Sequence, residues 1–188
     1  MRLGAHARAV LEIGAGTGRL LAQVRAPIRV GLDVSREMLA RAAARPGLLL
    51  VRGDAHALPF ADASFDAVIA GKGAFRYLDA ARALAECHRV LRPGGRLGVH
   101  QYAAETWTWR RLLGREVRDP ATRRLHVERV ADLEARALEA GLVPVTAHLY
   151  RSVRVYPYAA RIPRRLAGRL WSHLVLICRR PAAPRSAS

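Results

Sequence analysis

A glutamate and three glycines stand together where the first short apolar run of the sequence ends. The run AVLEIG, residues 9–14, leads into GAGTG, so that Glu12 precedes Gly14, Gly16 and Gly18. Glycine lets a backbone turn tightly and approach a ligand closely, and a helix after such a turn offers its N-terminal N–H groups. The spacing differs from the GxGxxG loop that binds nicotinamide cofactors, because Arg19 stands where that loop needs its third glycine.

Carboxylates stand at or near the ends of the next two runs. Asp33 stands one residue before the end of IRVGLDV, where a carboxylate can accept hydrogen bonds from both hydroxyls of a ribose. Asp54 ends LLLVRGD, and Ala55 after it is placed to meet an adenine. Each feature alone fits a turn glycine or a capping aspartate. Their succession at three strand ends favours a site for a nucleoside-containing ligand.

Short apolar runs alternate with helical patterns along most of the chain, which predicts a parallel sheet with crossover helices. The strands are expected at 9–14, 28–34, 48–54, 65–71, 96–102, 142–150 and 171–180. The helices are expected at about 17–25, 35–44, 79–91, 106–117 and 127–141. Ser35 is the expected N-cap of the second helix, while Pro93 with two glycines and Gly141 are the expected stops of later ones. We predict a single α/β domain over 1–180, with helices on both faces of an open sheet and a disordered tail at 181–188. Ligands of such sheets bind at the carboxyl ends of the strands.

The composition is that of a globular domain with a strong basic excess. The formal net charge is +17, and Lys72 is the only lysine among 32 basic residues. One explanation of this excess is that arginine replaces lysine throughout the chain. The alternative is a basic surface that binds nucleic acid, an anionic membrane or an acidic partner.

Location is predicted from the cysteines and the apolar runs. Cys87 and Cys178 lie far apart without metal-ligand spacing and are expected to be buried, reduced thiols. No apolar run approaches the roughly 20 residues that span a bilayer, and no signal peptide opens the sequence. A cytoplasmic protein is expected.

Four segments in this order resemble the successive motifs of class I S-adenosylmethionine-dependent methyltransferases, particularly the UbiE-like, methyltransferase type 11 branch. They are VLEIGAGTGRL, VGLDVSREML, GDAHALPFADASFDAVIA and ECHRVLRPGGRL. The resemblance covers about residues 9–102, with weaker agreement to Arg180. It implies a Rossmann-like sheet of order 3-2-1-4-5-7-6 with the seventh strand antiparallel.

The resemblance also implies cofactor contacts. Glu12 and the loop of Gly14, Ala15, Gly16, Thr17 and Gly18 would hold the methionine part of S-adenosylmethionine. Asp33 would bind the ribose, with Val34 and Met38 beside the adenosine. Asp54 and Ala55 would contact the adenine, with His56 close by. The cofactor-binding residues would also include Gly53, Gly71 and Lys72.

The implied reaction is an in-line displacement, in which an acceptor atom attacks the methyl group of a sulfonium. Positioning supplies most of the rate effect in such a step, so a catalytic base is not required. The candidate catalytic residues are Lys72 and Tyr77 after the fourth strand and His100 on the fifth, although His100 fits a purely structural hydrogen bond equally. No NPPY-like or DPPY-like segment follows the fourth strand, which argues against methylation of exocyclic base amines.

Lys72 is expected to point away from the sulfonium, because two like charges about 4 Å apart repel by about 4 kcal/mol at an effective dielectric near 20. Its partner would be the cofactor carboxylate, Glu12 or an anionic acceptor. A solvated loop lysine is the alternative.

The sequence departs from the family before the first strand, where only eight residues precede Ala9. Relatives carry capping helices there, so the acceptor site is expected to be open, or closed by a second copy or a partner subunit. Trp107 and Trp109 fit an aromatic lid or simple packing. The arginine-rich segment 151–169, with Tyr156 and Tyr158, suits base stacking, an anionic headgroup or a solvated loop.

Three functions remain open on these grounds. The first is a methyltransferase for a small or medium-sized metabolite, with O-, N- or C-methylation undecided. The second is an RNA or protein methyltransferase that uses the basic segment. The third is a catalytically silent subunit that binds the cofactor.

Overall fold

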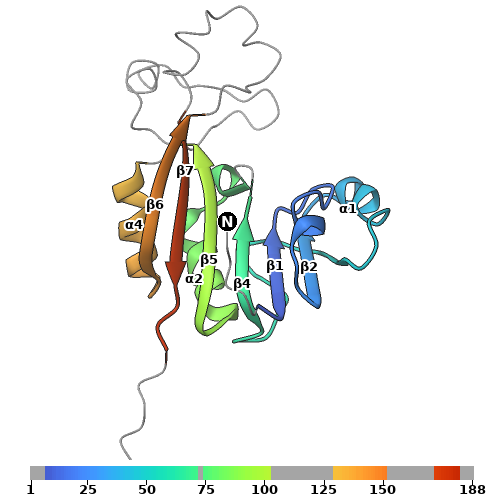
Figure 1. The fold of residues 1–188 in the computed structure, drawn as a ribbon, viewed down its shortest axis with the longest axis horizontal. Coiled ribbons are helices and arrows are strands. Elements are labelled where there is room, and N and C mark those ends of the chain that lie inside the picture. The colour runs from blue at the N-terminus through green and yellow to red at the C-terminus, as the bar shows by residue number, and fades with distance from the viewer. Residues whose placement is uncertain (1–6, 72–73, 103–128, 152–171, 183–188) are drawn as a thin grey trace, which may run out of the picture.

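The computed structural model describes residues 7–71, 74–102, 129–151 and 172–182. Its centre is a seven-stranded sheet of order β3-β2-β1-β4-β5-β7-β6, as predicted (Figure 1). The strands are β1 Ala9–Ile13, β2 Ile28–Asp33, β3 Leu49–Arg52, β4 Phe65–Ala70, β5 Leu91–Tyr102, β6 Val143–Arg151 and β7 Ser172–Arg179. Pairs from β3 to β5 are parallel, and β7 runs antiparallel to both of its neighbours.

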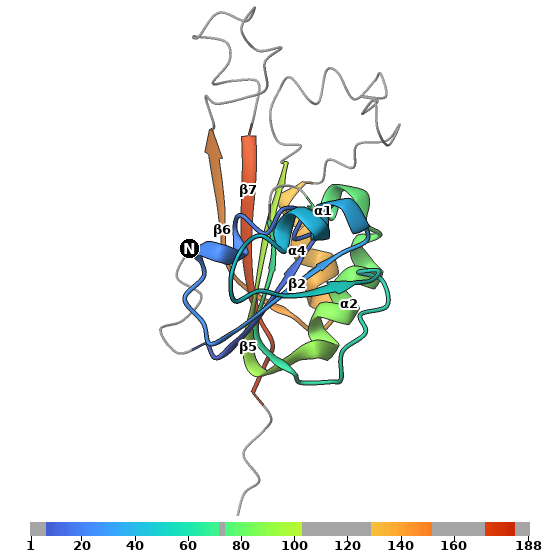
Figure 2. The same cartoon turned by 90° about the vertical axis from the view of Figure 1, so that its right-hand side faces the viewer.

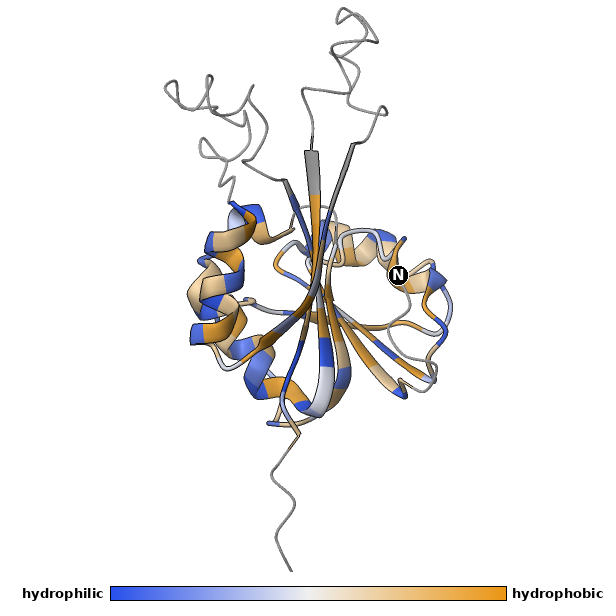
Figure 3. Cartoon of the chain, turned by 60° about the vertical axis from the view of Figure 1, so that its left-hand side comes forward, coloured by the Kyte–Doolittle hydropathy of each residue, from blue (hydrophilic) through white to orange (hydrophobic). Residues whose placement is uncertain are grey.

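The two longest described helices, α2 (Ala80–Val90) and α4 (Val130–Glu139), lie on one face of the sheet (Figure 2). Side chains alternate between the faces of a strand, so Leu11 and Val68 join the main core under these helices. Val10 and Ile69 point the other way and pack with Leu21 in a smaller cluster. Figure 3, in which hydrophobic residues are orange, shows them concentrated along the central strands.

Helix ends follow local capping rules. Helix α1 (Arg36–Ala42) begins after Ser35, whose hydroxyl accepts a hydrogen bond from the Met38 backbone N–H at 3.3 Å, as predicted. Asp79 caps α2 through the Arg82 N–H. Gly141, just past α4, has a φ of +80°, the left-handed backbone expected of a stop residue.

The helix predicted at 17–25 is wrong. Only a short 3-10 turn, η1 (Leu21–Gln23), forms there. Gly18 adopts a φ of +68°, which interrupts a right-handed helix, and Val24 is already extended. The N–H of Leu21 is satisfied instead by the Glu12 carboxylate, at 3.0 Å from Oε2.

The start predicted for the fifth strand is also wrong. Strand β5 begins at Leu91 rather than at residue 96, directly after α2. The Pro-Gly-Gly segment is accommodated by a shift in register between Phe65 and Ala67 of β4. The backbone of Gly94 and Gly95 is paired with that of Arg180, which holds this segment in the sheet.

Several predictions lie outside the described residues: the helix at 106–117 with Trp107 and Trp109, most of the arginine-rich segment, and the tail from 183. Among the described helices, none is long and apolar enough to cross a membrane. Both cysteines are free and buried, as expected.

Candidate functional site

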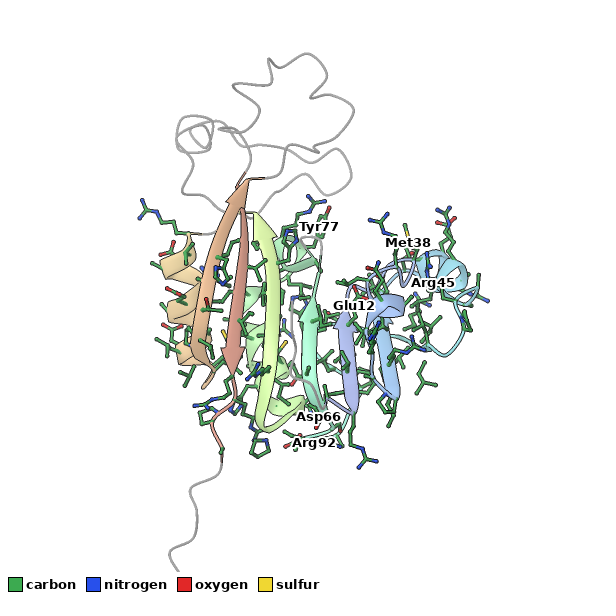
Figure 4. All side chains as sticks on the ribbon, in the orientation of Figure 1. Glu12, Met38, Arg45, Asp66, Tyr77 and Arg92 are labelled. Atoms are coloured by element: carbon green, nitrogen blue, oxygen red, sulfur yellow. The ribbon has the colours of Figure 1, made fainter. Side chains whose placement is uncertain are left out.

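A cleft of about 440 Å³ opens at the carboxyl ends of the parallel strands, where the predicted site lies. This volume is in the range of small-molecule sites, about 300–1,000 Å³. Figure 4 shows Glu12 and Tyr77 at this edge and Asp66 and Arg92 at the opposite one. The cleft is lined by Ile13, Gly14, Leu32, Asp33, Val34, Gly53, Ala55, Gly71, Ala74, Tyr77 and Leu78.

The loop after β1 follows the backbone that its glycines allow. Gly14, Gly16 and Gly18 all have positive φ values, of 66°, 55° and 68°. A Cβ at Gly14 would lie 2.7 Å from the Cβ of Ala74, whereas one at Gly16 would meet nothing within 4 Å. Gly14 therefore allows the loop to pack closely on the segment after β4. The space next to the Gly16 Cα is open.

Asp33 joins this loop to β2. Its Oδ2 accepts a hydrogen bond from the Gly16 N–H at 2.8 Å, and its Oδ1 accepts one from the Ser35 N–H at 2.9 Å. The Ala15 N–H donates to the Leu32 carbonyl at 3.0 Å. The ends of β1 and β2 are thereby held as one wall of the cleft.

Glu12 is 3% exposed and contacts the segment that follows the same loop. Besides accepting from Leu21, it approaches Gly71, where a Cβ would lie 3.5 Å from Glu12 Oε1 and 2.5 Å from Leu20 Cδ2. A side chain at position 71 would therefore require the Leu20 side chain to move. Lys72 lies outside the described residues, so its expected contact with Glu12 or with the cofactor carboxylate stays a prediction.

Asp54 and His56 form a pair in the turn after β3. The Oδ1 atom of Asp54 lies 2.9 Å from the His56 backbone nitrogen and 2.7 Å from its Nδ1. These hydrogen bonds, first from the backbone and then from the ring, lower the pKa of Asp54 below its ordinary value. Gly53 and Ala55 line the cleft, whereas Asp54 and His56 are not among its lining residues.

The segment after β4 forms the third wall. The 3-10 turn η2 (Ala74–Tyr77) places Ala74 and Tyr77 in the lining, and Leu78 follows. The Arg76 guanidinium lies over the Tyr77 ring, 4.5 Å from its centroid, and also contacts the Tyr77 hydroxyl. Tyr77 is 44% exposed, and its role as a catalytic residue stays a prediction.

Other predicted residues are not among those that line the cleft. His100 sits in β5 opposite Val175 of β7 and is half-buried. Met38 on α1 is 37% exposed. The carbonyl oxygen of Thr17 accepts a hydrogen bond from Arg45 Nε at 2.7 Å. Gly18 packs near Leu48. Their assigned roles stay predictions.

Sequence reasoning missed four apolar lining residues: Ile13, Leu32, Ala74 and Leu78. Ile13 and Leu32 directly precede Gly14 and Asp33, so their positions at strand ends were a usable signal. Ala74 and Leu78 belong to a segment whose path no local pattern predicts.

The sheet order is the one that the resemblance to class I methyltransferases implied. The methyltransferase-domain family matches residues 11–99, the part of the chain in which the sequence motifs predicted a methyltransferase. The chain is 44% identical over 119 residues to an uncharacterized methyltransferase of Mycobacterium tuberculosis, covering 60% of this chain and 47% of that protein. It is 43% identical over 101 residues to the demethylmenaquinone methyltransferase of Beutenbergia cavernae, covering 52% and 42%.

The chain spans about half the length of these curated relatives. Among solved structures, it matches a chain in the complex of the Haloferax volcanii Trm112 methyltransferase activator with a methyltransferase. The TM-score is 0.78 at 24% identity, covering 98% of this chain and 87% of that one. This similarity confirms the fold.

Proposed function

We propose that this protein is an S-adenosylmethionine-dependent methyltransferase that acts on a small or medium-sized metabolite. The observation that carries the proposal is the apolar cleft bordered by the Asp33 carboxylate and the left-handed Gly16. An adenosine needs an apolar slot for its base and an acceptor for its ribose hydroxyls. The residues present offer both, so they fit this cofactor.

The chain's own residues would bind the cofactor and orient it toward the acceptor. Each oxygen of Asp33 accepts one backbone N–H and has capacity for a second donor, which allows it to bind the ribose. Val34 and Ala55 would flank the base, and Glu12 with the glycine loop would hold the methionine end. When bound, S-adenosylmethionine supplies a methyl group on a positively charged sulfur. Holding the acceptor in line with that group accounts for most of the expected rate effect.

The acceptor would enter between the ends of β4 and β5. Tyr77 lines the cleft there, and His100 and Lys72 remain candidates to deprotonate or bind it. The demethylmenaquinone methyltransferase of Beutenbergia cavernae is named for a small-molecule acceptor, which supports a metabolite rather than a nucleic acid. Two free buried thiols fit the reducing cytoplasm that we propose as its location. We also propose that residues 1–180 form a single domain. A second copy or a partner subunit would cover the acceptor site.

Calorimetric titration with S-adenosylmethionine tests the shared premise. Saturable binding with one site per chain is expected, and S-adenosylhomocysteine should compete. No binding at millimolar ligand would contradict the proposal. Transfer of a labelled methyl group to a panel of phenols, quinols and carboxylates then identifies the acceptor class. Binding without transfer to any acceptor would favour a silent subunit.

A further inference from the structure

His56 joins two segments that line the cleft from different strands. It lies in the turn after β3, next to Ala55. Its Nδ1 lies 2.7 Å from Asp54 Oδ1, and its Nε2 lies 2.9 Å from the backbone nitrogen of Asp79. Asp79 directly follows Leu78 of the third wall. The imidazole therefore bridges the β3 turn and the start of α2.

The partners determine which ring nitrogen carries the hydrogen. The Asp79 N–H can only donate, so Nε2 must accept and Nδ1 must donate to Asp54. The backbone N–H of His56 donates to the same Asp54 oxygen at 2.9 Å. With its side chain 19% exposed, the ring is largely shielded from competing water.

Helix α2 begins with half of a capping box. The Asp79 side chain accepts from the Arg82 N–H at 3.1 Å, as an N-cap residue should. In a complete box, a glutamate or glutamine at the position of Arg82 reaches back to accept the N-cap N–H. Arginine has no acceptor. His56 supplies that acceptor from the β3 turn, so the start of the helix is tied to the cleft.

We propose that His56 is a positioning residue of the cofactor site, which fixes the β3 turn against the start of α2 and so sets the cleft between Ala55 and Leu78. This inference rests on the proposed function. It replaces direct cofactor contact by His56, since the ring has both nitrogens engaged within the protein. The groups that its ring meets are the Asp54 carboxylate and the Asp79 N–H, and the Arg82 guanidinium is the nearby cation.

Three substitutions separate the two contacts. H56A removes both, H56N keeps a donor near the Nδ1 position, and H56Q keeps an acceptor near the Nε2 position. We expect the Kd for S-adenosylmethionine to rise about tenfold in H56A and less in the other two, in line with the loss of one or two hydrogen bonds. A wild-type Kd in H56A would overturn the inference while leaving the proposed function intact.

The R82Q substitution separates positioning from helix capping, because glutamine completes the local box. R82Q alone should bind the cofactor like the wild type. In the H56A/R82Q double variant, the Tm should recover most of what H56A loses, while the Kd stays about tenfold weaker. Recovery of both would mean that His56 only caps the helix, which overturns the inference.

The ring tautomer gives a readout without cofactor. Long-range ¹H–¹⁵N correlation spectra should show the Nδ1–H form of His56, and an Nε2–H form would overturn the inference. Failure of the wild type to bind S-adenosylmethionine would instead reject the proposed function, and with it the cofactor role of the bridge.

Discussion

The backbone N–H of Gly16 donates a hydrogen bond to Oδ2 of Asp33 over 2.8 Å, which fixes the loop after β1 against the end of β2. The second oxygen of Asp33 accepts from Ser35. The two motifs are 17 residues apart in sequence, yet they form one wall of the cleft. The carboxylate is therefore already oriented before any ligand enters.

The D33N variant tests that orientation. One oxygen would be replaced by an NH₂ group facing a backbone N–H, which leaves a donor unsatisfied. We expect the free energy of unfolding to fall by about 1–3 kcal/mol and cofactor binding to weaken at least tenfold. Urea unfolding and calorimetric titration measure these. E37Q, which changes an exposed carboxylate on α1, is the control, and a D33N Kd within twofold of the wild type would contradict the assignment.

Gly14 and Gly16 should respond differently to alanine. Both have positive φ, so each substitution costs about 1–2 kcal/mol in backbone strain. G14A also clashes with the Cβ of Ala74, adding about 1–3 kcal/mol of overpacking. Urea unfolding should therefore rank G14A below G16A in stability. The A74G substitution should recover the clash part in G14A/A74G, and no recovery would rule out Ala74 as the cause.

Arg179 and Arg180 are adjacent but should differ in their effect on stability. Arg180 Nη1 lies 2.9 Å from the His88 carbonyl and 3.1 Å from that of Arg89, and it also contacts the carbonyl of Leu91. R180A leaves these carbonyls at the end of α2 without that donor, so a loss of about 1.5–3 kcal/mol is expected. R179A changes an exposed side chain and should stay within about 0.5 kcal/mol. Equal Tm values for the two variants would contradict this.

Asp66 should make stability depend on pH. Burial alone would raise its pKa, but hydrogen bonds from Arg92 and from the N–H groups of Ala9 and Arg8 lower it overall. Because the pKa of Asp66 is lower in the folded state than in the unfolded state, this carboxylate stabilises the fold at pH values above its unfolded pKa, which is near 4. The stabilisation is lost as the pH falls through the folded pKa. The stability difference between wild type and D66N should thus be largest at neutral pH and shrink below about pH 4. Denaturant unfolding from pH 3 to 7 measures it, and a constant difference would be contrary evidence.

The two thiols should be unreactive in the native protein. Burial, with the nearby charge of Glu86, raises the pKa of Cys87. Burial, with the charge of Glu134, raises the pKa of Cys178 to about 12. Because the thiolate is the nucleophile, a disulfide reagent at pH 8 should label neither until denaturant is added, and both afterwards. Rapid native labelling would show that one of them is accessible.

The family resemblance implied the sheet order, whereas local sequence patterns were enough to predict the capping residues Ser35 and Gly141 and the strand ends that carry Gly14, Asp33 and Ala55. These features depend on alternation of apolar residues, on glycine backbone freedom and on the position of a residue at the end of a strand. Each of these is encoded within a few neighbouring residues.

Tertiary structure alone decided the rest. The helix expected at about 17–25 gives way to η1, whose first N–H is satisfied by the buried Glu12. Strand β5 starts five residues early because its Pro-Gly-Gly segment pairs with Arg180 near the other end of the chain. The bridge from His56 to Asp79 and the entry of Leu78 into the cleft likewise depend on partners distant in sequence. A backbone or side-chain group takes whichever hydrogen-bond partner the packed fold brings to it, and a local pattern does not contain that partner.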